Sequence, residues 1–219
     1  CRRDRVRFVQ CGILKMKNKI IAVIGAGGKT TLIHRLAEEY RRKGASVLVS
    51  TTTHMLVEPD TDLSCDSFAI MEKIKKTGYC MAGAVCPENS AKMQSLPEQM
   101  LHDLMKQVDY ALIEADGAKH YALKYPSEQE PVIPEGTTDV ILVLGSWDLG
   151  KPCKDVVFRF EHMTSALGIS GDMKADKQML QWIWQAYEEK LKNMDYQGHF
   201  HVLLSEKTDQ GLVFHTLEE

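Results

Sequence analysis

Residues 20–24, Ile-Ile-Ala-Val-Ile, form an unbroken aliphatic run that passes directly into Gly25-Ala26-Gly27-Gly28-Lys29-Thr30-Thr31. A run of this length and β-branched content is typical of a strand buried on both faces of a parallel sheet. Residues 30–43 then carry apolar side chains at helical spacing and stop at Gly44, a common residue after a helix. Strand, glycine-rich turn and helix in this order predict the opening unit of an α/β fold.

The same alternation continues along the chain. Further strand-like runs occur at residues 47–49, 81–85, 110–113, 140–144 and 200–204. One helical pattern follows Ser95, whose spacing to Glu98 is that of a capping box, and another covers residues 174–194, whereas residues 55–77 show no clear pattern. Strands separated by helices predict a mostly parallel sheet with helices on both faces, a three-layer sandwich similar to that of P-loop NTPases. We expect residues 20–219 to form a single domain of this kind.

Composition limits the classes of partner. The chain has 219 residues with 27 basic and 30 acidic side chains, a net charge of −3, which argues against general binding to nucleic acids or anionic membranes. Its longest apolar runs have the length of strands and are too short to cross a bilayer. The six cysteines contain no C-x-x-C pair, as expected of reduced thiols. We therefore predict a cytoplasmic protein with no nucleic-acid or membrane partner.

Residues 1–19 form a basic N-terminal extension in which Asp4 is the one acidic residue. They lack the apolar core and the cleavage site of a secretory signal. Because the chain starts at Cys1, two interpretations stay open: the native protein begins at Met16, or residues 6–9 add a short edge strand.

The glycine-rich segment has the composition of a phosphate-binding loop. Glycines let backbone N–H groups approach phosphate oxygens, and the helix that follows presents its positive end. Lys29 would pair with the β- and γ-phosphates, and the Thr30 hydroxyl would ligate Mg²⁺. Val23 holds the first position of the G-x-x-x-x-G-K-[ST] pattern, so the motif has a shorter form that resembles the loop of the murein peptide ligases. The alternative is a glycine-rich turn with an incidental lysine.

A nucleotide held by this loop requires a carboxylate from a neighbouring strand to bind its metal ion. Glu114 and Asp116 directly follow the strand at 110–113, and Glu114 with Gly117 has the E-x-x-G spacing of the GTPases that assist metal insertion into urease, hydrogenase and cobalamin enzymes. That resemblance implies that Glu114 binds Mg²⁺ through a water and that the Gly117 N–H senses a γ-phosphate. Asp116 is a candidate for orienting the attacking water. The alternative is a solvated acidic turn.

Polar residues after the other strands supply further candidates. Of Thr51 to Thr53, which end the second strand, we select Thr52 to position water, with an ordinary β-branched strand end as the alternative. His54 is a candidate proton carrier. Four further residues could neutralise phosphate or a second anionic ligand: Lys92, Lys119, His120 and Lys124. The alternative is that these side chains are simply solvated. His199 and His201 have the same-face spacing of a metal pair, but no third ligand is near in sequence.

The end of the last strand carries a partial base-reading motif. In GTPases N-K-x-D at this place binds guanine, whereas here Glu206 stands where asparagine is expected. Lys207 and Asp209 remain candidates for contacting a nucleobase, and an ordinary surface turn is the alternative. The choice between ATP and GTP stays open.

Together these residues resemble the YqeC family, whose members are associated with selenium cofactor biosynthesis and selenium-dependent hydroxylases. The resemblance is carried by residues 23–32, 50–53, 114–119 and 130–134. It implies a P-loop protein that acts in the maturation of selenium-dependent molybdenum hydroxylases, with such a hydroxylase or its cofactor-maturation proteins as partner. It therefore implies a pathway rather than a defined reaction.

The function predicted from these features is Mg²⁺-dependent binding and slow hydrolysis of a nucleoside triphosphate, ATP or GTP. Lys29 would stabilise charge on the transferring phosphoryl group, while Thr30 and Glu114 would hold the metal ion. Two alternatives stay open. One is an ATP-dependent phosphotransferase or ligase acting on a small acceptor, and the other is a nucleotide-gated chaperone or scaffold without catalysis.

Overall fold

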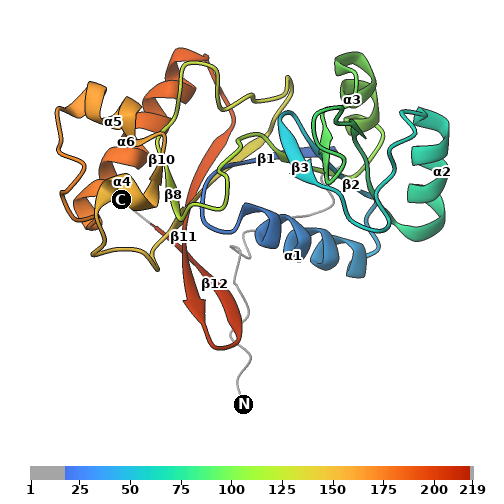
Figure 1. The fold of residues 1–219 in the computed structure, drawn as a ribbon. Coiled ribbons are helices and arrows are strands. Elements are labelled where there is room, and N and C mark those ends of the chain that lie inside the picture. Colours follow the sequence, from blue (N-terminus) through green and yellow to red (C-terminus); the bar gives the residue numbers. More distant parts are fainter. Residues whose placement is uncertain (1–17, 218–219) are drawn as a thin grey trace.

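The computed structural model describes residues 18–217 and has a seven-stranded sheet at its centre (Figure 1). The strands of this sheet are β1 (Lys19–Gly25), β2 (Val47–Thr51), β4 (Tyr79–Met81), β7 (Tyr110–Glu114), β9 (Asp139–Gly145), β11 (His199–Thr208) and β12 (Gly211–Thr216). Their spatial order is β12-β11-β9-β1-β7-β2-β4, and all neighbours are parallel except β12, which pairs antiparallel with β11. Parallel neighbours require long crossovers, so strands in contact are far apart in sequence.

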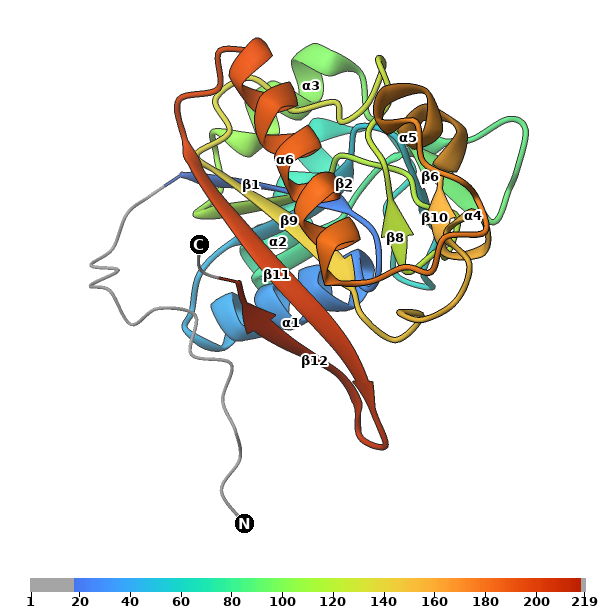
Figure 2. The same ribbon diagram turned by 90° about the vertical axis from the view of Figure 1, so that its left-hand side faces the viewer.

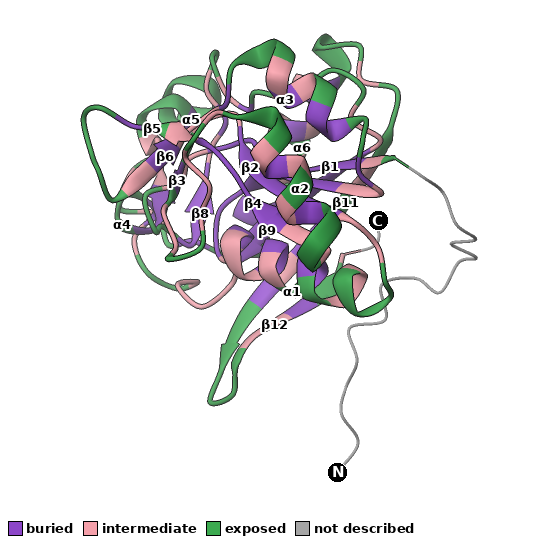
Figure 3. Cartoon of the chain, turned by 90° about the vertical axis from the view of Figure 1, so that its right-hand side faces the viewer, coloured by how far each residue is buried: buried purple, intermediate pink, exposed green. Residues whose placement is uncertain are grey.

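Both faces of the sheet are covered, and its central strands are buried throughout (Figure 3). Every residue of β9 is buried, and β1 is buried from Ile20 onward. Helix α1 (Lys29–Arg42) packs on one face. On the opposite face, α6 (Lys177–Asn193) covers β9 and β11 (Figure 2). On the same face, α2 (Ser67–Thr77) and α3 (Glu98–Met105) cover β2 and β7. The fold is the three-layer α/β sandwich that the alternating strand and helix patterns predicted.

Two small sheets add to the carboxyl edge of the central sheet and line a cavity there. One pairs β8 with β10 in parallel, next to the short helices α4 and α5, and the other is antiparallel with the order β3-β6-β5. These elements are β3 (His54–Leu56), β5 (Ala84–Val85), β6 (Lys92–Gln94), β8 (Leu123–Lys124), β10 (Val157–Phe158), α4 (Cys153–Val156) and α5 (Phe160–Leu167). They come from loops that follow the parallel strands, the usual source of binding residues in α/β folds.

Two predicted helix starts are displaced for identifiable reasons. The capping box is wrong, because α3 begins at Glu98 and the Ser95 hydroxyl instead donates to the carbonyl oxygen of Leu96 at 2.9 Å. A residue that precedes proline is held away from the helical region, so Leu96 cannot open the helix. The last helix begins later than predicted because Asp176 caps it by accepting from the N–H of Met179 at 3.0 Å.

Other differences concern elements that the sequence pattern did not predict. The segment 55–77 contains α2, the strand predicted at 81–85 is divided into β4 and β5, and β11 continues to Thr208 and turns into β12 (Figure 2). The edge strand considered at residues 6–9 lies outside the described residues. Among residues 18–217, no helix has the length and apolar character needed to span a membrane.

Candidate functional site

A cavity of about 790 Å³ opens at the carboxyl edge of the sheet, where the glycine-rich loop meets the small sheets and the β11–β12 hairpin. Among the described residues, the cations that line it are Lys29, Lys92, Lys119, Arg159 and Lys207, and the carboxylates are Glu88, Glu114 and Glu130. His54 and His120 line it as well, as does Thr30, so most of the predicted polar candidates meet at this cavity. Five cations against three carboxylates favour an anionic ligand.

The glycine-rich loop is pressed against the end of β9. Gly25, Gly27 and Gly28 have φ angles of 84°, 85° and 113°, which L side chains rarely adopt. A Cβ atom on Gly27 would lie 2.6 Å from the backbone of Gly145 and 2.7 Å from the carbonyl oxygen of Ala122. Only glycine fits at this position, and the close approach fixes where the loop faces the cavity.

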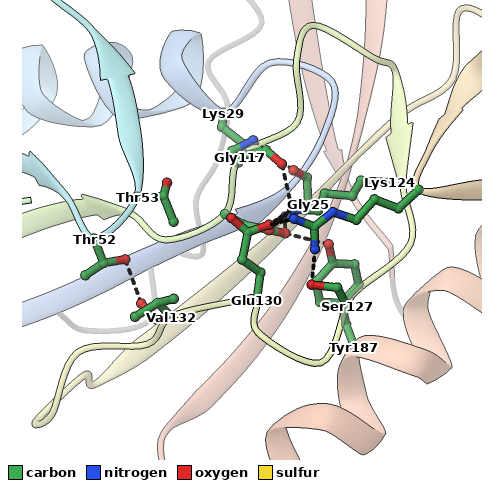
Figure 4. A network of polar contacts seen from close by, with 12 residues as sticks. Gly25, Lys29, Thr52, Thr53, Gly117, Lys124, Ser127, Glu130, Val132 and Tyr187 are labelled. Atoms are coloured by element: carbon green, nitrogen blue, oxygen red, sulfur yellow. Dashed lines mark hydrogen bonds and ion pairs between the residues drawn. The ribbon is translucent and has the colours of Figure 1, made fainter. Parts of the chain in front are cut away.

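The unpaired N–H groups at the start of α1 and the Lys29 ammonium create a positive electrostatic potential inside the loop. The N-cap of α1 is Gly28, which has no side chain to cap the first N–H groups, and those groups have no partners within the helix. The Lys29 ammonium donates to the carbonyl oxygen of Gly25 at 2.8 Å (Figure 4). Burial lowers the pKa of Lys29, although the charges of Glu114 and Asp116 oppose this effect. Backbone donors and an ammonium on one turn make a binding site for anions.

Thr30 and Glu114, the two residues predicted to hold a metal ion, are in contact. Strand β7 lies beside β1 with Glu114 opposite Val23, so the Thr30 hydroxyl donates to Glu114 Oε2 at 3.1 Å. Glu114 is only 7% exposed, and burial raises its pKa, against the opposing effects of the Lys29 charge and the Thr30 hydrogen bond. A hydroxyl and a carboxylate side by side are oxygen ligands of the kind that Mg²⁺ prefers.

Asp116 lies beneath the loop and is fully buried. Its carboxylate accepts from the Gly25 N–H at 3.0 Å and from the Tyr187 hydroxyl at 2.5 Å, and it pairs with Lys124. Burial raises the pKa of Asp116, and the charge of Lys124 opposes this rise. Asp116 is not among the described residues that line the cavity, so its contacts place it to fix the loop and not, as predicted, to orient water.

Lys124 joins Asp116 to a second carboxylate, that of Glu130. Its ammonium donates to Glu130 Oε2 and to the carbonyl oxygen of Gly117, both at 2.6 Å, while Arg159 approaches the same Glu130 oxygen at 2.9 Å. Burial opposes ionisation of Glu130, but Lys124 and Arg159 hold its pKa below the usual range. Lys124 is fully buried with its donors occupied, so it cannot serve the predicted second anionic ligand as a solvent-facing cation.

Thr51, which ends β2, and the two threonines that follow it lie in different environments. The buried Thr51 hydroxyl donates to the carbonyl oxygen of Glu114 at 2.8 Å. The Thr52 hydroxyl donates to the carbonyl oxygen of Val132 at 2.7 Å (Figure 4), whereas Thr53 lines the cavity. Of the three, Thr53 and not the predicted Thr52 is placed to meet a ligand.

Trp147 and Lys207 form another part of the cavity wall. The Lys207 ammonium lies 4.5 Å from the centroid of the indole ring. Trp147 was missed by sequence reasoning, although it follows β9 by two residues and residues after strands are the usual ligand contacts. Asp209 is exposed in the hairpin turn and is not among the described lining residues, so the fold does not bring it to the cavity with Lys207.

His199 and His201 lie at the opposite, amino-terminal edge of the sheet. Both approach Oδ1 of Asp139, at 3.9 Å from Nδ1 of His199 and 3.3 Å from Nε2 of His201, and Lys19 pairs with the same carboxylate. Within residues 18–217 these side chains do not form a group of three with metal-binding geometry. Asp139 is a third group of the right type, but the described geometry does not support the interpretation of a metal pair.

Comparison with known proteins adds to this geometry. The profile of the family described as YqeC protein matches residues 21–161, more than half of the chain. The chain belongs to the YqeC family. Over 161 residues it is 34% identical to "Uncharacterized protein YqeC" of Escherichia coli (strain K12), an alignment that covers 70% of this chain and 62% of the length of that relative. No solved structure matches the chain.

The YqeC match includes the glycine-rich loop, Glu114 and the buried pair of Asp116 and Lys124. It ends before Tyr187 and Lys207, which lie in the part of the chain beyond the family profile. The names of the YqeC family and of its relative state no activity.

We expect Glu114→Gln to stabilise the ligand-free protein near neutral pH. Burial raises the pKa of Glu114, so its ionised form costs free energy in the folded state above that raised pKa. The cost fades as the pH falls through the raised pKa and is absent below the ordinary value of 4.5. Urea unfolding at several values between about pH 8 and about pH 4 should show the advantage of the variant shrinking on acidification. An advantage that is constant across this range would contradict the assignment.

Proposed function

We propose that this chain binds a nucleoside triphosphate together with Mg²⁺ and hydrolyses it slowly. The observation that carries the proposal is the contact between the Thr30 hydroxyl and the Glu114 carboxylate, beside the buried ammonium of Lys29. Catalysis of phosphoryl transfer rests mainly on positioning and on charge stabilisation, and these three side chains with the first turn of α1 supply both.

Each residue has a defined part in this proposal. Lys29 and the N–H groups at the start of α1 bind phosphate oxygens, while Thr30 and Glu114 hold the metal ion. Mg²⁺ supplies neutralisation of the phosphate charge when it is bound. Asp116 fixes the start of the loop through the Gly25 N–H, and Thr53 is the cavity-lining hydroxyl that would hold the attacking water.

A titration of the protein with ATP and with GTP, each with and without Mg²⁺, tests this proposal. We expect one nucleotide to bind per chain by isothermal titration calorimetry, with affinity that falls when Mg²⁺ is removed. Release of inorganic phosphate, followed in parallel, measures turnover. Failure of both nucleotides to bind in the presence of Mg²⁺ would refute the proposal.

We place the nucleobase against Trp147 and Lys207, the aromatic and cationic wall next to the loop. Trp147→Ala should then weaken nucleotide binding by about 1–3 kcal/mol, the cost of losing one base–aromatic stacking contact. Phe68→Ala is the matched control, because Phe68 is 72% exposed on α2 and is not among the lining residues. Equal affinities of these two variants, measured by calorimetry, would place the base elsewhere.

Family membership supports the biological part of the proposal. As a member of the YqeC family, the chain would act in the cytoplasm as an accessory factor in selenium cofactor biosynthesis, for a selenium-dependent molybdenum hydroxylase or the proteins that mature its cofactor. A second candidate reaction is phosphoryl transfer to a small anionic acceptor, favoured by Lys119 and Arg159 in the cavity wall. This reaction predicts that ADP formation rises sharply when an acceptor is added.

The non-catalytic alternative is a nucleotide-gated chaperone. It predicts that nucleotide-dependent binding of the partner persists in the Glu114→Gln variant.

A further inference from the structure

The cavity contains a second cluster of metal-ligating side chains, separate from Thr30 and Glu114. The cluster consists of His54, Cys86 and Glu88, whose ligand atoms all lie within 4.8 Å of one another. The Cys86 thiol is buried and donates to Glu88 Oε2 at 3.3 Å, while His54 and Glu88 are exposed. All three side chains line the cavity, so an ion held between them would be open to it on one side.

The small sheet β3-β6-β5 builds this cluster from distant parts of the chain. His54 on β3 and Ala84 on β5 both pair with Gln94 of β6, and Cys86 follows Ala84 by two residues. Cys86 directly follows the end of β5, and its thiol sulfur lies within 4.8 Å of the ligand atoms of His54 and Glu88. The turn that begins at Cys86, closed by a hydrogen bond of 3.2 Å from the Asn89 N–H to the Cys86 carbonyl oxygen, returns Glu88 over the thiol.

From this geometry we infer that His54, Cys86 and Glu88 bind a borderline-soft divalent metal ion such as Zn²⁺. A thiolate, an imidazole nitrogen and a carboxylate oxygen are the three ligand types of zinc, and three protein ligands leave one position for water or another ligand. Thiolate selects against Mg²⁺, which prefers oxygen ligands. The site is therefore chemically distinct from the Thr30–Glu114 pair, and its metal displaces the thiol proton to solvent on binding.

Hydrogen bonds connect the segment that carries His54 to the strand end that carries Glu114. Thr51 and Thr52 both donate to the carbonyl oxygen of Glu114, the first from its hydroxyl at 2.8 Å and the second from its N–H at 3.1 Å. His54 follows this anchored segment by two residues, so its position depends on the strand end that carries Glu114. The inferred ion and the proposed nucleotide would share one cavity, but the metal site uses none of the nucleotide-binding side chains.

Titration of the nucleotide-free, untagged chain with Zn²⁺, in competition with a chromophoric chelator, tests the inference. We expect the chain to bind one equivalent of Zn²⁺ tightly. Cys86→Ser and His54→Ala should each weaken Zn²⁺ binding by at least about 10- to 100-fold. Loss of a residue that merely supports a metal ligand already costs this much, and loss of the ligand itself should cost no less. Co²⁺ used as a spectroscopic probe should give a thiolate charge-transfer band that Cys86→Ser removes. Cys65→Ser is the matched thiol control, because Cys65 is not among the cavity-lining residues, and it should bind as the unsubstituted protein does.

Two further variants make the Zn²⁺ titration conclusive. Glu88→Gln changes an exposed side chain, so it tests the site even if Cys86→Ser, at a buried position, fails to fold. Lys29→Ala should retain Zn²⁺ binding, so failure of the nucleotide proposal and failure of this inference give different results. Affinities for Zn²⁺ that are the same in Cys86→Ser, Glu88→Gln and Cys65→Ser would overturn the inference and leave the Cys86–Glu88 contact as a hydrogen bond only.

Discussion

Lys29→Ala is expected to weaken Mg²⁺-dependent nucleotide binding by about 3 kcal/mol, or more than about 100-fold. The ammonium lies inside the glycine-rich loop, 2.8 Å from the carbonyl oxygen of Gly25, and is only 6% exposed. A hydrogen bond to a charged group contributes about 1.5–3 kcal/mol, and each 1.4 kcal/mol changes affinity about tenfold. The alanine variant would leave the phosphate charge to the backbone donors and the helix dipole alone.

Calorimetric titration of both proteins with ATP and GTP in the presence of Mg²⁺ measures the effect. Lys43→Ala is the matched control, because Lys43 directly follows the last turn of the same helix and pairs there with Glu39 on the protein surface. The control should bind nucleotide with unchanged affinity. Equal heats from Lys29→Ala and the unsubstituted protein would exclude the loop as the phosphate site.

Lys124→Met is expected to produce the largest loss of stability, about 3–5 kcal/mol. The substitution removes a fully buried cation and leaves the carboxylate of Asp116 uncompensated, which is far more costly than losing a surface pair. Glu130 keeps Arg159 as a partner, so Asp116 carries most of the penalty. Asp116 also accepts from the Gly25 N–H and so positions the glycine-rich loop. We therefore expect Lys124→Met to weaken nucleotide binding even in the molecules that remain folded.

Urea unfolding measures this loss, with Lys119→Met as the control because Lys119 is exposed above the Phe158 ring. The control should change stability by less than about 1 kcal/mol. Burial raises the pKa of Asp116 above its ordinary 3.8, so the penalty in Lys124→Met is present at neutral pH and declines as the pH falls through the raised value. Adding Asp116→Asn should restore part of the stability. A loss no greater than that of the control would show that the pair is not the stabilising element.

Features of this chain that depend on neighbouring residues could be predicted from the sequence, and most of those that depend on distant residues could not. The β1–loop–α1 unit was predictable because an aliphatic run, glycines and a helical repeat each act within a few residues. The contact of Glu114 with Thr30 was also within reach, since parallel strands end at one edge of the sheet and Glu114 ends a buried run. The same reasoning failed for Asp116, because β7 ends at Glu114 and the chain beyond it is no longer a strand, so Asp116 lies beneath the loop whereas Glu114 lines the cavity.

The amino-acid sequence alone therefore determined the three-layer α/β sandwich, the glycine-rich loop and the family. All three depend on short-range pattern and composition. Tertiary structure alone decided the partners of Lys124, the wall formed by Trp147 and Lys207, and the meeting of His54 with Cys86 and Glu88. Asp116 and Glu130 lie eight and six residues from Lys124, and the folding of the single connection between β7 and β9 brings them together. The other contacts join segments far apart in the sequence, whose distance depends on sheet order and strand register. Side-chain spacing within one segment carries no information about either, because the same segment could follow a strand at the centre or at the edge of the sheet.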